Sequence, residues 1–161
     1  MKSTRQNLIL VGGIFHDFQA SAEALAMILA PLGIESRIEA DLDAGIASER
    51  IVLAGFSQGG AVVYHTALAY PKPLGGLLTL STYFPAAEEV QLSAANKSLP
   101  IHIFRGTQDP MVVEAMGHAA KQTLQGMGFR PEYRCYPMQH EVCGEEIVDI
   151  GNSLKAWLQL S

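Results

Sequence analysis

The sequence predicts an α/β fold, with a mostly parallel sheet held between two layers of helices in a three-layer αβα sandwich. Short apolar runs of strand length alternate along the chain with segments whose apolar residues recur at helical spacing. Several runs are apolar at every position, which is typical of strands buried on both faces. Glycines and prolines punctuate the segments, and no repeat or low-complexity tract interrupts them. We therefore expect one minimal domain over residues 1–161.

The first elements are expected in the order strand, helix, strand. The apolar run at residues 8–15 fits a first buried strand. Apolar residues recur at helical spacing over residues 22–32, and Pro31-Leu32-Gly33 is expected to close that helix. Alternation then predicts a half-buried strand from Ile34 to Glu39.

The remaining elements continue the alternation. Further strands are expected over residues 51–53, 75–80, 101–104 and 132–136, because each is a short run rich in apolar or β-branched residues. Helices are expected at about residues 61–69, 113–127 and 145–160. A strand that alternates with a helix in this way favours parallel pairing, with helices on both faces of the sheet.

The turn between the strand at 51–53 and the helix at 61–69 carries the most specific chemical signal. Gly55, Ser57 and Gly59 form G-x-S-x-G, the pattern of a nucleophile elbow. The turn is so sharp that the residues two before and two after the serine must be small. The helix that follows directs its positive dipole end and free N–H groups at the place where an oxyanion would form. Ser57 is the expected nucleophile.

Two further residues follow strands in the order that a catalytic triad on this fold requires. Asp109 comes after the strand at 101–104, and His140 comes after the strand at 132–136. Side chains that follow parallel strands reach the carboxyl-end edge of the sheet, where open α/β sheets place their sites. The chain order Ser, Asp, His is the one that accompanies a nucleophile elbow.

The segments at residues 55–60, 106–110 and 136–141 together resemble the carboxylesterase and acyl-protein thioesterase family of α/β-hydrolases, also described as phospholipase/carboxylesterase. The resemblance runs from about Gly45 to the carboxyl terminus and includes Leu80-Ser81-Thr82-Tyr83 and the last helix. It implies a shortened α/β-hydrolase in which Ser57 is the nucleophile, His140 the general base and then acid, and Asp109 the carboxylate that fixes the imidazole tautomer.

The first 45 residues depart from that family. Its members carry a His-Gly-Leu-Gly segment after their first strand and a further helix before the elbow, whereas this chain has Gly12-Gly13-Ile14 and a shorter connection. A gapless placement on the family's loop makes the N–H groups of Ile14 and Gln58 the oxyanion donors. Residues 8–43 also resemble the opening of trehalose-utilisation-type proteins, which suggests a chimeric or truncated amino-terminal part.

We expect an enzyme that hydrolyses short- to medium-chain carboxylic esters through an acyl-serine. Apolar walls are expected from substrate-binding residues next to the triad, namely Phe15, Phe56, Tyr83, Phe84 and Met111. Two alternatives stay open: an acyl-protein thioesterase or lysophospholipase-like activity, and an inactive remnant that only binds ligands or itself.

Composition excludes several classes of partner. The net charge of -5 and the scattered Lys and Arg residues argue against nucleic acid. No apolar run is long enough for a membrane span, which makes the cytoplasm the expected location. No cofactor is expected, and the histidines do not have metal-ligand spacing. Charged residues are only 17% of the chain, which favours a homo-oligomer that covers apolar surface.

Other residues could compete for the roles of acid and nucleophile. Asp17, Asp41 and Asp43 could supply the acid, but they precede the serine. A Cys143–His140 pair lacks an elbow, and Cys135 and Cys143 are expected to be free thiols. His65 is expected to be structural. Lys2, Arg5 and the apolar run after them have the outline of a short secretory signal, but the run fits a buried strand better.

Overall fold

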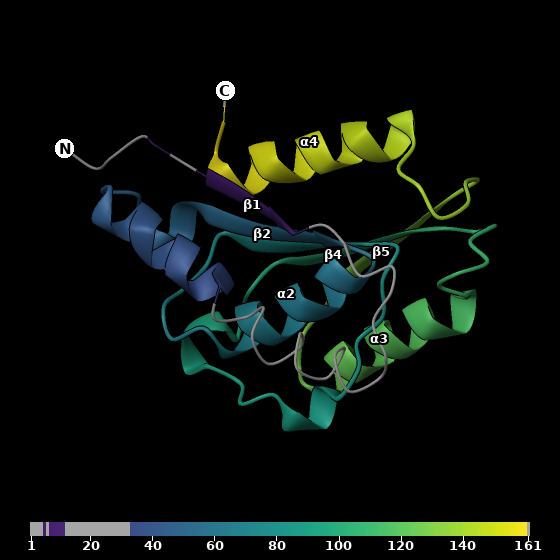
Figure 1. Cartoon of the computed structure of the whole chain (residues 1–161), viewed down its shortest axis with the longest axis horizontal. Helices are drawn as coiled ribbons and strands as arrows, with labels where there is room; N and C mark the ends of the chain where they lie inside the picture. The colour runs from purple at the N-terminus through teal and green to yellow at the C-terminus, as the bar shows by residue number, and fades with distance from the viewer. Residues whose placement is uncertain (1–4, 6, 12–32, 161) are drawn as a thin grey trace.

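A five-stranded parallel sheet forms the centre of the molecule in the computed structural model, which describes residues 5, 7–11 and 33–160 (Figure 1). The strands lie side by side in chain order, and each of the four neighbouring pairs is parallel. Their bounds are β1 Asn7–Val11, β2 Ile51–Phe56, β3 Gly76–Leu80, β4 Ile101–Gly106 and β5 Glu132–Tyr136.

Helices cover both faces of the sheet, as the sequence predicted. α2 (Gln58–Ala69) and α3 (Glu114–Gly126) lie on one face, and α4 (Gly144–Leu158) lies on the other (Figure 1). Two separate apolar clusters result, one between the sheet and α2 and α3, the other beneath α4. This arrangement is the three-layer sandwich expected from the alternation of elements.

The inner strand β2 lies between β1 and β3 and shows why its sequence is apolar throughout. Leu53 packs into the cluster on the α2 side, and Val52 and Ala54 pack into the cluster on the α4 side. All three side chains are buried. A strand covered on both faces has no solvent-facing positions, so its apolar run is continuous and does not alternate.

The segment that was predicted as a strand from Ile34 to Glu39 is helical, because residues 33–43 form a helix. The prediction was wrong because a spacing of four between apolar residues fits both periods: it is two repeats of a strand and about one turn of a helix. Ile34 and Ile38 are both buried in the cluster that includes α2. The closure expected at Gly33 is also wrong, since the described helix already includes that residue. Residues 22–32 lie outside the described part.

Several other element bounds differ from the predictions at their ends. β2 continues to Phe56, β4 continues to Gly106, and α2 already begins at Gln58. Two short 3₁₀ turns, η2 (Ala87–Glu89) and η3 (Ala94–Asn96), occupy the connection between β3 and β4. Within the described residues, no helix is both long and apolar enough to cross a membrane.

Backbone hydrogen bonds continue the sheet ladder past the carboxyl ends of the strands. The N–H of Ser57 donates to the carbonyl of Leu80 at 3.0 Å, and the N–H of Thr107 donates to the carbonyl of Tyr136 at 2.8 Å. These bonds tie each loop to the neighbouring strand. The loops that follow β2, β4 and β5 are thereby held at one edge of the sheet, where the predicted site residues lie.

Candidate active site

Ser57 lies on a sharp turn between β2 and α2. Its φ of 55° and ψ of −124° place it in a region that residues with a side chain rarely adopt. A Cβ atom added to Gly55 would lie 2.6 Å from the backbone nitrogen of Gly60 and would also collide with the carbonyl of Gly59. The turn can therefore close only around a glycine at position 55. This is the strained nucleophile elbow that the motif predicted.

Thr82 holds this turn from the neighbouring loop. Its Oγ1 donates a hydrogen bond of 2.5 Å to the carbonyl of Ser57, and its side chain occupies the space beside Gly60. A Cβ atom on Gly60 would lie 2.5 Å from the Cβ of Thr82. Sequence reasoning assigned Thr82 no role. The signal for it was Gly60, the glycine directly after the motif, which indicates that another part of the chain approaches closely.

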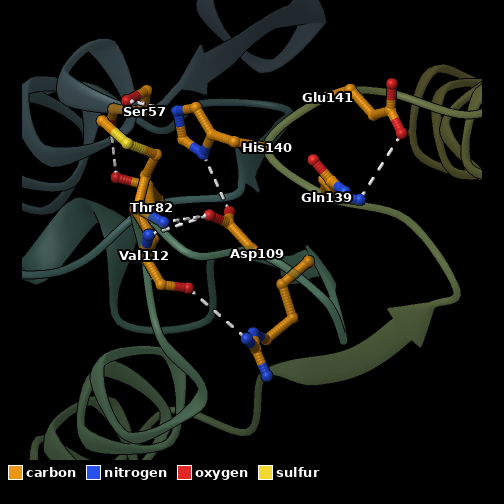
Figure 2. Close-up of polar contacts among 9 residues, drawn as sticks. Ser57, Thr82, Asp109, Val112, Gln139, His140 and Glu141 are labelled. Carbon is orange, nitrogen blue, oxygen red and sulfur yellow. Dashed lines mark hydrogen bonds and ion pairs between the residues drawn. The ribbon is translucent and has the colours of Figure 1, made fainter.

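His140 lies between Ser57 and Asp109. Its Nε2 lies 2.9 Å from Ser57 Oγ, and its Nδ1 lies 2.8 Å from Asp109 Oδ2 (Figure 2). The Phe56 ring packs against the imidazole with its centroid 4.8 Å from that of His140. Three residues predicted from separate motifs therefore meet in one chain of hydrogen bonds. This geometry allows a base to take a proton from the serine while the carboxylate orients the ring.

Asp109 is held by the turn that follows it. Its side chain has no exposed surface, and Oδ1 accepts hydrogen bonds from the N–H groups of Met111 at 2.8 Å and Val112 at 2.9 Å. Burial raises the pKa of Asp109, but the hydrogen bonds from His140 and these two N–H groups outweigh it and keep the pKa below its ordinary value. Asp109 therefore stays ionised and acts as an acceptor towards the imidazole.

The loop that carries His140 packs tightly against the end of β4. The N–H of Gln108 donates to the carbonyl of Met138 at 3.0 Å. At Gly106 a Cβ atom would collide with the carbonyls of Met138 and Gln139. The absence of a side chain at Gly106 thus lets the histidine loop lie directly against the loop that carries Asp109.

One of the two predicted oxyanion donors lies in the described structure. Gln58 is the first residue of α2, so its N–H has no acceptor within the helix and is next to the serine. The amino end of α2 adds a partial positive charge at the same place. Ile14 lies outside the described residues.

The predicted substrate-binding residues lie in different surroundings. Met111 is 67% exposed and follows Asp109 in the chain, whereas Phe56 packs on the imidazole of His140. Tyr83 and Phe84 line a cavity of about 190 Å³ against α3, together with Met116 of that helix. Phe15 lies outside the described residues.

A second serine–histidine pair lies beneath α4 and lacks the features of the first. Ser153 Oγ lies 2.8 Å from His102 Nδ1, and His102 Nε2 lies 3.1 Å from Glu132 Oε2. Ser153, however, lies within α4, is buried, and donates a hydrogen bond to the carbonyl of Asp149 one turn earlier. Burial lowers the pKa of His102, although Glu132 opposes this. Ser153 has no elbow and no adjacent free N–H groups, so this cluster joins α4 to the sheet.

The rival residues that the structure describes have other contacts. Asp41 accepts a hydrogen bond of 2.6 Å from the Asn7 side chain, which joins the helix at residues 33–43 to β1. Cys143 precedes the first residue of α4 as its N-cap, and both cysteines are free. His65 lies 2.7 Å from the carbonyl of Pro85, so it has the structural role that was expected. Asp17 lies outside the described residues, and the described part contains no group of residues suited to hold a metal.

The chain resembles proteins described as acyl-protein thioesterases and carboxylesterases. It is 36% identical over 126 residues to acyl-protein thioesterase 1 of Gibberella zeae, which covers 75% of this chain and 54% of that protein. It is 32% identical over 129 residues to carboxylesterase SOBER1 of Arabidopsis thaliana, which covers 78% of this chain and 57% of that one. The chain thus spans about half the length of the curated relatives it matches.

Solved structures agree with these sequence matches. The crystal structure of Arabidopsis thaliana SOBER1 superposes with a TM-score of 0.78 at 31% identity, over 82% of this chain and 64% of that one. The Bacillus cereus carboxylesterase gives the same TM-score of 0.78 at 16% identity over 97% of this chain, which shows the shared fold. The model of the phospholipase/carboxylesterase family matches residues 17–158, a match that starts ahead of Gly45, where the resemblance was expected to begin. The chain belongs to the phospholipase/carboxylesterase family of α/β-hydrolases.

Proposed function

We propose that this chain is a serine carboxylesterase that hydrolyses short- to medium-chain carboxylic esters through an acyl-serine intermediate. The observation that carries the proposal is the continuous line of hydrogen bonds from Ser57 Oγ through both imidazole nitrogens of His140 to buried Asp109. The same groups are the nucleophile, base and orienting carboxylate of a triad. The strained backbone conformation of Ser57 is typical of functional sites, and this favours an active enzyme over an inactive remnant.

In the first half of the reaction His140 Nε2 takes the proton of Ser57 as Oγ attacks the ester carbonyl. The carbonyl π electrons move to its oxygen, which becomes an oxyanion next to the N–H of Gln58 at the amino end of α2. Collapse of this intermediate breaks the bond to the leaving alkoxide. The imidazolium of His140 then donates its Nε2 proton to that oxygen and releases the alcohol.

Water completes the cycle by the same route in reverse. His140 Nε2 accepts a proton from the water as its oxygen attacks the acyl-serine carbonyl. The second oxyanion forms in the same position, and its collapse returns the proton to Ser57 Oγ as the acid leaves. Asp109 stays ionised throughout and stabilises the imidazolium, in agreement with its lowered pKa.

Thioester hydrolysis is the second candidate, because several relatives at 36% identity are described as acyl-protein thioesterase 1. A thiolate leaves more easily than an alkoxide, so the same residues would perform this reaction. The exposed Met111 and the cavity lined by Tyr83 and Phe84 support an apolar acyl group in either case.

A fluorophosphonate probe tests the activated serine directly. We expect the wild-type chain to be labelled and to hydrolyse p-nitrophenyl butyrate, whereas Ser57→Ala should be unlabelled and lose turnover by roughly 10⁴- to 10⁶-fold. Ser153→Ala is the matched control, because it removes the other serine that contacts a histidine. It should keep both labelling and turnover.

Labelling that persists in Ser57→Ala, or an unlabelled wild-type chain, would contradict the proposal and favour a ligand-binding remnant. A panel of p-nitrophenyl esters of increasing chain length, compared with acyl-thiocholine esters, separates the two candidate substrates. A carboxylesterase should turn over the short oxygen esters, and a thioesterase should prefer the thioesters at equal acyl length.

A further inference from the structure

Arg105 is a buried cation near the end of β4. Its side chain is 2% exposed and belongs to the largest fully buried side chains of the described residues. No carboxylate of the described residues forms an ion pair with it, and its Nε and Nη1 have no hydrogen-bond partner there. Burying a charge without a counter-charge is costly. A residue retained at such a cost needs a reason beyond packing.

The one hydrogen bond that the structure gives Arg105 leads to the candidate active site. Its Nη2 donates to the carbonyl of Val112 at 3.4 Å. The N–H of the same Val112 donates to Asp109 Oδ1, and the other carboxylate oxygen of Asp109 faces His140 Nδ1 (Figure 2). Arg105 is therefore joined to the imidazole through two backbone groups of one residue and through the catalytic acid.

The space around the guanidinium is shaped by a glycine of α3. A Cβ atom added to Gly117 would lie 3.0 Å from Arg105 Cδ and 3.0 Å from the Tyr133 hydroxyl, which itself has no hydrogen-bond partner among the described residues. The arginine thus lies between the sheet and α3 with little room to move. Its remaining N–H groups cannot turn to solvent, so the Val112 carbonyl is the acceptor that fixes its orientation.

We propose that Arg105 is a positioning residue for the catalytic acid. Its hydrogen bond to the Val112 carbonyl fixes the turn at residues 109–112, whose N–H groups bind Asp109. The fixed carboxylate then orients His140. The inference rests on the proposed triad.

The test replaces Arg105 with methionine, which fills similar space without donors. We expect the kcat of Arg105→Met for p-nitrophenyl butyrate to fall on the order of 10- to 100-fold with KM nearly unchanged, because misplaced groups slow the chemical step more than they weaken binding. The downfield proton resonance between His140 and Asp109 should shift or disappear. Arg105→Lys, which keeps the charge and a donor, should recover part of both signals.

Lys121→Met is the matched control, since it removes a cation of α3 that lies over the Tyr133 ring without removing a donor to the Val112 carbonyl. It should keep wild-type kcat and the wild-type resonance. A folded Arg105→Met variant with an unchanged resonance or an unchanged kcat would overturn the proposal, and so would an equal loss in Lys121→Met. An unlabelled wild-type chain would instead reject the triad, while the resonance would still report whether Arg105 positions Asp109.

A second pair of variants decides the matter if Arg105→Met does not fold. Gly117→Ala keeps the arginine but displaces its side chain, because the new Cβ would lie 3.0 Å from Arg105 Cδ. Gly126→Ala makes the same substitution at the end of α3, where a Cβ meets nothing within 4 Å. Lower kcat and an altered resonance in Gly117→Ala alone would support the proposal, and wild-type values in both would overturn it.

Discussion

At the scale of single residues, the geometry of the candidate site depends on closely packed neighbours of Ser57 as well as on the side chains of the proposed triad. Ser57 is held at a positive φ by contacts on two sides: Gly55 lets α2 approach, and Thr82 binds the carbonyl of the serine itself. Strain of this kind costs about 1–3 kcal/mol and persists only where the surroundings impose it. The conformation of the nucleophile is therefore a property of its neighbours.

Asp109→Asn should leave the fold intact and lower kcat on the order of 10⁴-fold, because an amide can hold the imidazole in the wrong tautomer. Steady-state hydrolysis of p-nitrophenyl butyrate measures this loss. Asp43→Asn is the control, since Asp43 is exposed and was a rival for the same role. Wild-type activity in Asp109→Asn would show that another group orients His140.

Gly55→Ala should destabilise the fold by about 3 kcal/mol or more, because the added methyl collides with the backbone of Gly59 and Gly60. Gly151→Ala provides a contrast of opposite sign: it lies within α4 with open space around it, and alanine there should stabilise by roughly 0.5–1 kcal/mol. Urea unfolding of both variants measures the difference. Equal stability of the two variants would contradict the tight turn described here.

At the scale of elements, the sequence predicted the strands and helices around the candidate site, because the spacing of their apolar residues fits only one type of secondary structure. β5 was predicted at its observed bounds, and the motif around Ser57 located both β2 and α2. The helix at residues 33–43 was missed, since Ile34 and Ile38 satisfy a strand and a helix equally. Only the packing of the helix against the sheet side that holds α2 decides between them.

The same limit explains which site residues the sequence could not provide. Ser57, Asp109 and His140 could be named as candidates because each has a motif and a place in the chain order, and the structure places them within hydrogen-bond distance of one another. Thr82 and Arg105 act through the three-dimensional contacts of a hydroxyl and a guanidinium with backbone carbonyls. Such contacts join loops distant in sequence and leave no spacing to recognise.

Ile38→Ala should cost about 2–5 kcal/mol of unfolding free energy, because Ile38 is fully buried between its helix and the core. Ile147→Ala deletes the same atoms from an isoleucine that is 59% exposed on α4, and it should cost far less. Denaturant unfolding compares the two variants. Similar costs at both positions would mean that the helix at residues 33–43 does not pack as described.

At the scale of the whole molecule, stability should depend on one buried acid in α4. Glu146 has no exposed surface, and neither carboxyl oxygen has a hydrogen-bond partner among the described residues. Burial raises the pKa of Glu146 from 4.5 to about 7. The folded state therefore keeps a proton that the unfolded chain releases above pH 4.5.

The sign of the pH dependence follows from this difference. The contribution of Glu146 is fully present below pH 4.5 and is lost as the pH rises to about 7, a change of roughly 3 kcal/mol. Glu146→Gln should abolish this slope, so its advantage over the wild-type chain should be larger at pH 8 than at pH 5. Thermal melts at both values measure it. A parallel pH dependence of the two proteins would contradict the raised pKa.

The outer strand of the described sheet is a candidate surface for self-association. β1 exposes Leu8 and Leu10, the latter by 64%, at an edge of the described sheet, and charged residues make up only 17% of the chain. We expect self-association through this apolar edge. Light scattering at low micromolar concentration should give a mass above 17.4 kDa, and Leu10→Lys should lower it. A monomeric wild-type mass without binding of a hydrophobic dye would contradict this.

The close contact of two backbone carbonyls with Gly106 limits how the two loops can change during evolution. Every other amino acid would push the carbonyls of Met138 and Gln139 away and separate the acid from the base. The loop of Asp109 and the loop of His140 therefore cannot drift independently. A substitution in one loop is tolerated only if the other loop can accommodate it. A loop that contains Asp109 and is grafted onto another protein would need the matching loop that contains His140.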